Sequence, residues 1–348
     1  MLRSRVPVAS LTTANVWGTL RPMAERRVAV LGTRYADLSV EEQVLGPLGV
    51  VLVAGDGGSA EEVVATARGA EVVLAGSRPR FPAAVVAALA ATGCRGLVRY
   101  GIGTDSIDVE AAGRAGLAVA RVSDYGTEAV AFHTVSMVTA LLRRLREADA
   151  AVRRGEWGVA GLRPLHLPSR LTAGVVGYGR IGRRTSESLR GLGFRVVAHD
   201  ELVAVPADAG VRPVGLDELL AVADVVTLHM PGDPGGAPLM DTARLGAMSE
   251  GSVLVNTSRG SLVDVPALVA ALAAGRPAAA ALDVYPQEPP DVSVFAPVSD
   301  RVLLTPHMAW YTEESELDMR RKAAEEAARL LRGEPLREPV TAAEVAAR

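Results

Sequence analysis

The sequence predicts an α/β fold of two Rossmann-like domains, each built on a doubly wound parallel sheet, with the cofactor domain inserted into the substrate domain. Short, continuous apolar runs such as Val28–Leu31 and Ala173–Val176 recur along the chain, as in parallel strands that are covered on both faces. Segments of helical character alternate with these runs, which indicates repeated strand–helix–strand units. The length of 348 residues is enough for roughly two domains.

The first unit is expected over residues 26–122. Two Ala-rich segments between its apolar runs, Ala60–Arg68 and Ala83–Ala91, are predicted helices. The predicted strands of this unit are Val28–Leu31, Val50–Val53, Val72–Leu74 and Leu97–Tyr100. Residues 1–25 lack the continuous apolar stretch of a signal peptide, so they are interpreted as a flexible N-terminal extension.

One long helix is predicted next, over Glu128–Arg154. Its apolar residues recur at three- and four-residue steps through Val135, Val138 and Leu142, and Gly155 follows its charged end. A loop rich in glycine and proline then leads to the second unit.

The second unit begins at Leu171 and is predicted to hold six strands, which match a doubly wound nucleotide-binding sheet. These predicted strands are Ala173–Val176, Arg195–His199, Val225–His229, Ser252–Asn256, Ala278–Val284 and Val302–Leu304. A last amphipathic helix is expected over Glu313–Leu331. We therefore expect an NAD-binding domain of residues 123–306, inserted into a substrate domain made of residues 26–122 and 307–348.

Composition excludes several classes of function. A formal net charge of -3 and a pI near 6.0 disfavour nucleic acid as a partner. The single cysteine, Cys94, rules out an internal disulfide framework and a cysteine-rich zinc site, so we expect a cytoplasmic protein without a metal centre. The only lysine, Lys322, lies outside any glycine-rich loop, which excludes a Walker A motif. No apolar run is long enough to span a membrane.

A glycine-rich motif predicts the cofactor site. The predicted strand that ends at Val176 is followed by Gly177-Tyr178-Gly179-Arg180-Ile181-Gly182 and then by a helical segment, Arg183–Leu192. We expect Gly177 to permit the tight turn, Gly179 to let a pyrophosphate approach the backbone, and Gly182 to let helix and strand pack closely. The N-terminus of the helix then offers free N–H groups to the phosphates.

The acid at the end of the next predicted strand selects the type of dinucleotide. Asp200 lies 18 positions after Gly182, near the spacing expected of the carboxylate that binds the adenosine ribose hydroxyls. A carboxylate there repels a 2′-phosphate. The sequence therefore predicts NAD as the cofactor instead of NADP.

Three segments at later strand ends of the same sheet supply one guanidinium, one carboxylate and one imidazole: Arg259, Glu288 and His307. Reduction of a 2-oxo acid needs this set, because negative charge develops on the oxygen at C2 and a proton must be delivered there. An arginine can bind the substrate carboxylate in bidentate fashion and polarise the carbonyl. A histidine beside a carboxylate is a suitable proton donor.

At these residues the chain resembles the D-2-hydroxyacid dehydrogenase family. The resemblance covers about residues 28–331 and depends on four motifs in order: GYGRIG at 177–182, VNTSRG at 255–260, ALDVYPQEP at 281–289 and LTPHMAW at 304–310. The run Arg99–Asp105 and the Ala309-Trp310-Tyr311 run are similar to those of the branch that contains the C-terminal-binding proteins.

The resemblance implies roles for these residues. Arg259 would bind and polarise the substrate, Glu288 would partner the histidine, and His307 would be the acid/base. Asp283 would face the nicotinamide carboxamide. Further cofactor contacts would come from Ile102, His229, Met230, Pro231, Thr257 and Ser258. The substrate would be bound by the loop of Arg99, Tyr100, Gly101 and Gly103, with Trp310 as a wall of the pocket and Arg99 as a second cation.

The sequence thus predicts an NAD-dependent D-2-hydroxyacid dehydrogenase, or 2-oxo acid reductase, acting on a small acid. Two alternatives stay open: an NAD(H)-responsive scaffold with little turnover that recruits partner proteins, and oxidation of an unusual acid such as a phosphonate. The family resemblance also implies a homodimer, with residues 128–170 as the expected contact region. Neither a nucleic acid nor a membrane is expected as a partner.

Overall fold

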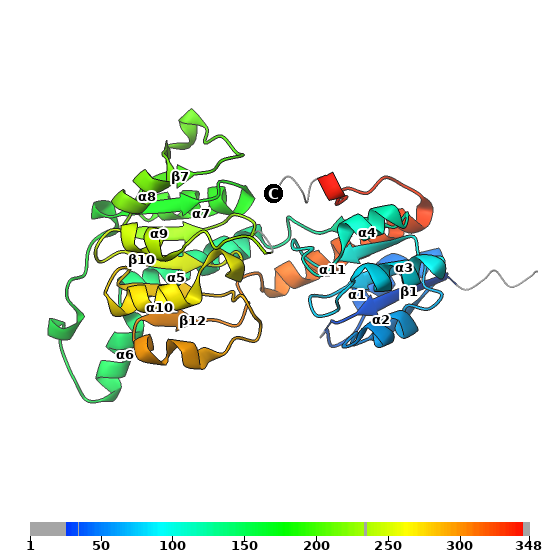
Figure 1. Cartoon of the computed structure of the whole chain (residues 1–348), viewed down its shortest axis with the longest axis horizontal. Coiled ribbons are helices and arrows are strands. Elements are labelled where there is room, and N and C mark those ends of the chain that lie inside the picture. The colour runs from blue at the N-terminus through cyan, green and yellow to red at the C-terminus, as the bar shows by residue number, and fades with distance from the viewer. Residues whose placement is uncertain (1–25, 34, 233–234, 344–348) are drawn as a thin grey trace, which may run out of the picture.

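The computed structural model describes residues 26–33, 35–232 and 235–343, and it has two lobes that are joined by extended segments (Figure 1). The N-terminal extension predicted over residues 1–25 lies outside the described residues. Each lobe contains one parallel sheet with helices on its faces, so the predicted fold class is confirmed.

The first lobe holds a five-stranded sheet of order β2-β1-β3-β4-β5, in which every pair of neighbours is parallel. Its strands are β1 (Arg26–Leu31), β2 (Val50–Gly55), β3 (Val72–Ala75), β4 (Gly96–Arg99) and β5 (Ala118–Arg121). The sequence predicted the first four but not β5. That edge strand is short, half alanine and ends in an arginine, so it contains few of the large β-branched residues that mark a strand.

Five helices cover this sheet, four of them short and local in sequence. They are α1 (Ser39–Leu45), α2 (Ala60–Thr66), α3 (Ala83–Ala91), α4 (Val109–Arg114) and the C-terminal α11 (Glu313–Arg332). Helix α11 begins with a capping box formed by Thr312 and Ser315 and ends at Gly333, whose φ of 72° suits glycine. Its buried alanines, such as Ala323 and Ala327, pack against β3 and β4, so the end of the chain completes the first lobe.

The second lobe holds a seven-stranded parallel sheet of order β12-β11-β10-β9-β6-β7-β8. Its strands are β6 (Thr172–Val176), β7 (Arg195–His199), β8 (Arg212–Pro213), β9 (Val225–Leu228), β10 (Val253–Asn256), β11 (Ala279–Leu282) and β12 (Val302–Leu304). The chain winds outward from β6 in both directions, so the order of strands reverses between β6 and β9. Ligands of such sheets bind at that point, at the carboxyl ends of the strands. The sequence missed β8 because it is only two residues long.

The prediction of one continuous helix over Glu128–Arg154 is wrong. The structure has two helices, α5 (Thr127–Leu142) and α6 (Leu145–Arg153), and Arg144 between them has a φ of 49°. A residue in this left-handed conformation ends a helix. The apolar periodicity continues across the break, but Leu145 on α6 is 55% exposed and does not continue the buried face of α5.

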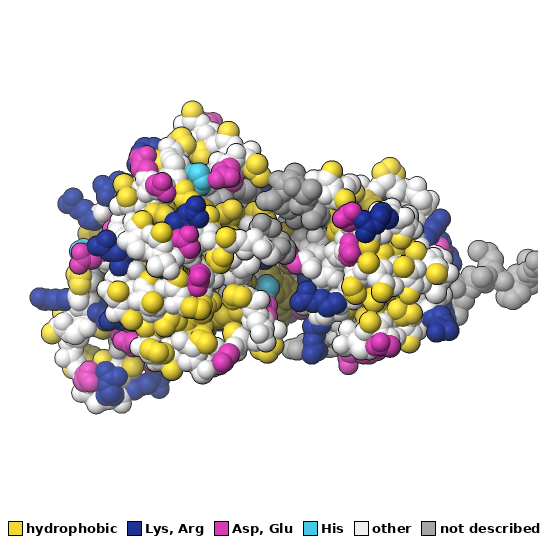
Figure 2. Space-filling model, in the orientation of Figure 1, with side chains coloured by type: hydrophobic (Ala, Val, Ile, Leu, Met, Phe, Trp, Pro, Cys, Tyr) yellow, Lys and Arg dark blue, Asp and Glu magenta, His cyan; other side chains and the backbone are white. Residues whose placement is uncertain are grey.

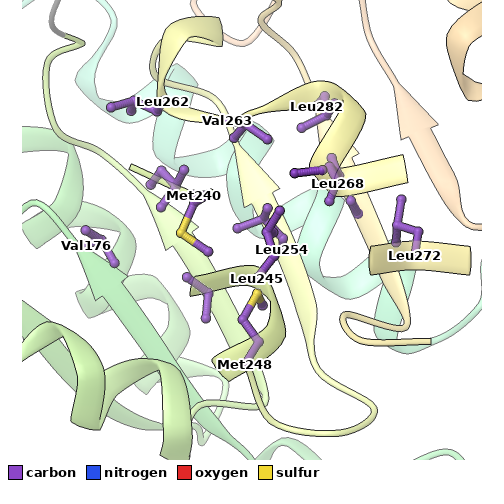
Figure 3. Close-up of a cluster of buried hydrophobic side chains, with 14 of the residues drawn as sticks. Val176, Met240, Leu245, Met248, Leu254, Leu262, Val263, Leu268, Leu272 and Leu282 are labelled. Atoms are coloured by element: carbon purple, nitrogen blue, oxygen red, sulfur yellow. The ribbon is translucent and has the colours of Figure 1, made fainter. Parts of the chain in front are cut away.

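Both faces of the seven-stranded sheet are covered by apolar side chains. On one face, Leu254 of β10 packs against Leu245 of α9 (Thr242–Ala247) and Leu268 of α10 (Val265–Ala273) (Figure 3). Two further helices of this lobe are α7 (Arg180–Gly191) and α8 (Leu216–Val222). On the other face, Met137 and Val138 of α5 join a second buried cluster. Each buried large side chain contributes roughly 1.5–3 kcal/mol, and this packing fixes the strand ends that carry the site.

Candidate active site

The glycine turn after β6 is tightly constrained at two of its three glycines. Gly177 has a φ of 93°, and a Cβ there would lie 2.6 Å from the carbonyl carbon of His229. A Cβ on Gly182 would lie 2.0 Å from the carbonyl oxygen of Gly177. At Gly179, by contrast, no atom of the described residues lies within 4 Å of the Cβ position. This open space above the backbone fits a pyrophosphate, as the motif requires.

Helix α7 starts directly after Gly179, and no side chain caps its first N–H groups. These free donors and the helix dipole favour an anion at this end of the helix. The Tyr178 ring is buried in the core and Ile181 is half-buried, so from this motif the backbone is what faces the cofactor side. The Arg180 guanidinium reaches the other lobe, where it donates to Ser123 and lies 3.7 Å from Glu338.

Asp200 follows β7 and lies beside the glycine turn. Its carboxylate accepts a hydrogen bond of 2.5 Å from the Tyr178 N–H, and its other oxygen accepts from the N–H groups of Leu202 and Val203. The acid is therefore at the carboxyl edge of the strand next to β6, where a ribose-binding acid of this fold is expected. Together, the open turn and this carboxylate fit NAD.

Beside the glycine turn, the ends of β9 and β10 form a wall at the same edge of the sheet. The Ser258 hydroxyl donates to the Met230 carbonyl, and the hydroxyls of Thr257 and Thr134 lie 2.8 Å apart. His229, which precedes Pro231, lies 2.9 Å from the Thr227 hydroxyl. Burial lowers the pKa of the His229 imidazole to about 3, so this wall is polar and uncharged at neutral pH.

The imidazole and the carboxylate predicted to work together are in contact. Nδ1 of His307 lies 2.7 Å from Oε2 of Glu288, and the two side chains are 48% and 38% exposed. The other Glu288 oxygen accepts from the Tyr285 N–H at 3.1 Å. Partial burial acts to raise the pKa of Glu288, but the hydrogen bond and attraction to His307 outweigh it, so its pKa is lowered.

Asp283 anchors the loop that carries the histidine. Its fully buried carboxylate accepts from the Thr305 hydroxyl (2.5 Å) and from the N–H groups of Met308 and Ala309 (both 2.9 Å). The N–H of His307 also donates to the Asp283 carbonyl at 2.8 Å. This anchoring holds His307 in a left-handed conformation with a φ of 54°. The contact with a nicotinamide carboxamide stays a prediction.

Arg259 meets the loop of Arg99–Asp105 on the other lobe. Its Nε lies 3.4 Å from a carboxylate oxygen of Asp105, and its Nη1 donates to the Ser258 carbonyl at 2.8 Å. A Cβ on Gly103 would lie 2.6 Å from Nη2 of Arg259, so the guanidinium packs directly against the backbone of this loop. In Figure 2 the surface is hollowed between the lobes, with basic side chains on the facing lobe.

The side chains of the other residues predicted to bind the substrate or cofactor from this part of the chain lie in different surroundings. The Arg99 guanidinium is enclosed, donates to the Tyr100 carbonyl, and leaves its Nε unpaired among the described residues. Burial lowers the pKa of Arg99. The Tyr100 side chain is buried in the first lobe, where its hydroxyl donates to Glu41 at 2.9 Å. Ile102 is half-buried. Trp310 donates from Nε1 to the His307 carbonyl at 3.1 Å.

Sequence reasoning missed three contributors to this site. Asp105 pairs with Arg259, and both Thr134 and His133 of α5 reach the carboxyl edge of the second sheet, where His133 lies 3.3 Å from the Thr305 hydroxyl. Asp105 could have been found from the sequence, because it is a charged residue that follows directly after the Gly-x-Gly segment of the loop.

Across the described residues, no group of His, Cys, Asp and Glu has the arrangement of a metal site. In the same part of the chain, no helix combines the length and apolar character needed to cross a membrane.

Residues 135–309 match a protein family described as D-isomer specific 2-hydroxyacid dehydrogenase, NAD binding domain. The chain belongs to this family. The match covers the seven-stranded sheet and the segments that carry Asp200, Arg259, Glu288 and His307, and it shows NAD as the cofactor. Members of the family are NAD-dependent oxidoreductases that act on a CH–OH group.

Individual relatives agree with this assignment. The chain is 34% identical to D-3-phosphoglycerate dehydrogenase of Archaeoglobus fulgidus over 286 residues, which are 82% of this chain and 54% of that protein. It is 35% identical to the enzyme of the same name from Methanocaldococcus jannaschii over 68% of this chain and 45% of that protein. The chain thus spans about half the length of these curated relatives. The apo structure of Escherichia coli D-lactate dehydrogenase superposes with a TM-score of 0.78 at 30% identity, covering 90% of this chain and all of that one.

Proposed function

We propose that the protein interconverts a small D-2-hydroxy acid and the corresponding 2-oxo acid with NAD. The observation that carries this proposal is the contact of His307 with Glu288 at 2.7 Å, on the same edge of the sheet as Arg259. When bound, the nicotinamide supplies or accepts the hydride at C2. The side chains of this chain bind the acid and move the proton.

In the reductive direction, Arg259 binds the substrate carboxylate and stabilises the negative charge that grows on the C2 oxygen. Glu288 engages Nδ1 of His307, which leaves Nε2 free among the described residues to donate the proton to that oxygen. In the oxidative direction, neutral His307 accepts the proton of the alcohol. Arg99 adds a second positive charge for the acid, and Trp310 forms a wall of the pocket.

For NAD, we propose that the turn Gly177–Gly182 and the start of α7 bind the pyrophosphate, and that Asp200 binds the adenosine ribose. The remaining cofactor contacts would come from Ile102, His229, Met230, Pro231, Thr257, Ser258 and Asp283. Support comes from the open space at Gly179 and from the uncapped helix N-terminus beside it. The enclosed Arg99 and the close packing of Gly103 against Arg259 favour a small acid.

The test is NADH oxidation with a panel of 2-oxo acids that includes glyoxylate, pyruvate and bulkier aliphatic, aromatic and dicarboxylic acids. We expect turnover of at least one, and we expect His307→Ala to lower kcat by about a hundredfold or more while NADH binding is retained, because the proton donor is lost. Tight NADH binding without turnover by the wild type would instead favour a scaffold that senses NAD(H).

We also propose that the protein acts as a cytoplasmic homodimer through residues 128–170, and that residues 123–306 form the inserted domain. Large apolar side chains in the contact region are strongly exposed, with Phe132 at 71%, Trp157 at 92% and Leu167 at 67%. The buried, unpaired Cys94 is compatible with a reducing compartment. Light scattering tests the dimer, and a monomer at micromolar concentration would contradict it.

A further inference from the structure

His133 of α5 lies at the carboxyl edge of the second sheet, and the reaction proposed above does not use it. Its Nε2 lies 3.3 Å from the hydroxyl oxygen of Thr305 and 3.8 Å from Oδ1 of Asp283, and the imidazole is only 19% exposed. The next residue of the helix, Thr134, lies 2.8 Å from the hydroxyl of Thr257. Two adjacent residues of α5 therefore contact the segments that follow β12 and β10.

The backbone of Thr305 is fixed without help from α5. Its N–H donates to the Leu282 carbonyl at 3.0 Å, and its carbonyl accepts from the Tyr285 hydroxyl at 2.9 Å. The side chain can still rotate about its χ1 bond, so the groups around it decide where the hydroxyl points. Among the described residues, the hydroxyl makes polar contacts with Asp283 and His133.

The direction of these two hydrogen bonds follows from the number of protons. The Thr305 hydroxyl has one proton, which it donates to the Asp283 carboxylate at 2.5 Å, because a carboxylate can only accept. The same hydroxyl can then only accept from the imidazole. Nε2 of His133 is therefore the nitrogen that carries a proton, and a chain of hydrogen bonds runs from it through the hydroxyl to the buried carboxylate.

This chain ends on the group that holds the proton donor. The Asp283 carboxylate also accepts from the N–H groups of Met308 and Ala309, both at 2.9 Å. Between these contacts, His307 has a φ of 54°, which is unfavourable for a residue with a Cβ. A strained segment relaxes when its anchor weakens, and His307 would then leave the position in which it can transfer a proton.

We propose that His133 is a positioning residue for the proton donor. Its Nε2–H orients the Thr305 hydroxyl toward Asp283 and thereby keeps the segment of His307 in its strained conformation. The inference rests on the proposed function, in which His307 transfers the proton. It assigns His133 no contact with the substrate or the cofactor, so the whole effect on the reaction passes through Thr305.

The first experiment compares kcat for a reduced 2-oxo acid in two variants of His133. His133→Leu removes the donor, and we expect kcat to fall about fivefold, as for the loss of one hydrogen bond, with KM for the acid and Kd for NADH within about twofold. His133→Gln keeps an N–H donor, so its kcat should be within about twofold of the wild type. The control is Ser136→Ala on the same helix, whose hydroxyl bonds the Phe132 carbonyl, and it should leave kcat unchanged.

A second experiment tests whether the effect of His133 passes through Thr305. Thr305→Val removes the hydroxyl and lowers kcat itself, so adding His133→Leu to this variant should lower kcat no further. A fivefold loss in both backgrounds would overturn the inference, because His133 would then act without Thr305. An unchanged kcat in His133→Leu would overturn it too, as would a His133→Gln variant as slow as His133→Leu.

Hydrogen exchange gives a readout that does not depend on turnover. We expect the amides of Met308 and Ala309 to exchange about fivefold faster in His133→Leu than in the wild type, and at nearly the wild-type rate in His133→Gln. Wild-type exchange rates in His133→Leu would overturn the inference. If the wild type reduces no 2-oxo acid, the proposed function fails, while the exchange rates still decide whether His133 holds this segment.

Discussion

The cofactor side and the substrate side of the site are built on different physical grounds. The side proposed to bind the cofactor consists of a glycine turn, an uncapped helix N-terminus and a wall of neutral polar groups. On the side proposed to bind the substrate, the guanidiniums of Arg99 and Arg259 come from different lobes, and a carboxylate oxygen of Asp105 lies 3.4 Å from Nε of Arg259. The first arrangement depends on space beside the backbone, within the glycine turn and between Gly177 and His229. The second depends on charges that are brought together over long sequence distances.

Because of this difference, the two parts of the site should tolerate different kinds of substitution. A backbone site is insensitive to most side-chain changes but fails when a Cβ fills its space. A site built from charges tolerates small changes of shape, but it fails when a charge is left buried without its partner. Three substitutions separate these two kinds of sensitivity.

The largest effect is expected at the buried ion pair that supports the substrate loop. Glu41 is fully buried and accepts from Arg320 at 2.7 and 3.0 Å and from the Tyr100 hydroxyl at 2.9 Å. Glu41→Ala leaves the Arg320 charge buried and unpaired, so we expect the free energy of unfolding to fall by about 3–5 kcal/mol. Urea unfolding measures it.

The matched control for Glu41 is Glu71, which pairs with Arg26 at 2.8 Å on the same sheet but is 29% exposed. For Glu71→Ala we expect a loss below about 1 kcal/mol. If Glu41→Ala and Glu71→Ala lowered the free energy of unfolding equally, the stability of the first lobe would not depend on its buried charges. The contrast between a site built from backbone space and one built from charges would then be contradicted.

A second prediction concerns the backbone site. Gly182→Ala places a Cβ 2.0 Å from the Gly177 carbonyl oxygen, so the helix must move away from the turn. We expect a lower Tm and a Kd for NADH that is raised about a hundredfold, which corresponds to about 3 kcal/mol of strain. Fluorescence titration with NADH and thermal unfolding measure the two effects.

Gly179→Ala is the control for this change, because no described atom lies within 4 Å of its Cβ position. Its Tm should equal that of the wild type, while NADH binding should weaken if a pyrophosphate approaches the backbone here. A normal NADH affinity in Gly179→Ala would place the pyrophosphate elsewhere.

The smallest effect is a change in the pH dependence of stability. The unfolded chain protonates His229 near its ordinary pKa of 6.5, whereas the folded protein does so only near pH 3. Between these values the unfolded state binds the extra proton, so the wild type loses stability as the pH falls below about 6.5. For His229→Asn we expect the slope of unfolding free energy between pH 6 and 4 to decrease by about 1.4 kcal/mol per pH unit.

The exposed His166, changed to Asn, serves as the control for His229. The same urea unfolding series at pH 7, 6, 5 and 4 applies to both variants. A slope in His229→Asn that equals the wild-type slope would show that the cofactor wall accepts a proton, contrary to its uncharged character.

Secondary structure was predictable from the sequence where the local pattern of residues was sufficient to define the element. Helix α3 was predicted with its observed bounds, Ala83–Ala91, and α11 began at Glu313 as expected. The break at Arg144 was not predictable, because a single residue of positive φ leaves the apolar periodicity around it unchanged. Strand β5 was missed for a related reason: its place at the sheet edge, and not its own composition, makes it a strand.

By itself, the sequence determined the doubly wound fold and the glycine turn, because apolar runs and glycines act through neighbours in the chain. Its ordered motifs predicted Arg259, Glu288 and His307 as the catalytic residues. Only the tertiary structure decided that Asp105 pairs with Arg259, that Tyr100 points into the core, and that Tyr125 lies beside Arg99. The Asp105–Arg259 contact joins the two lobes, and the other two contacts join segments of the first lobe that lie far apart in the sequence. The partners of these residues depend on how the sheets and helices pack in three dimensions, and the spacing of residues along the sequence does not predict that packing.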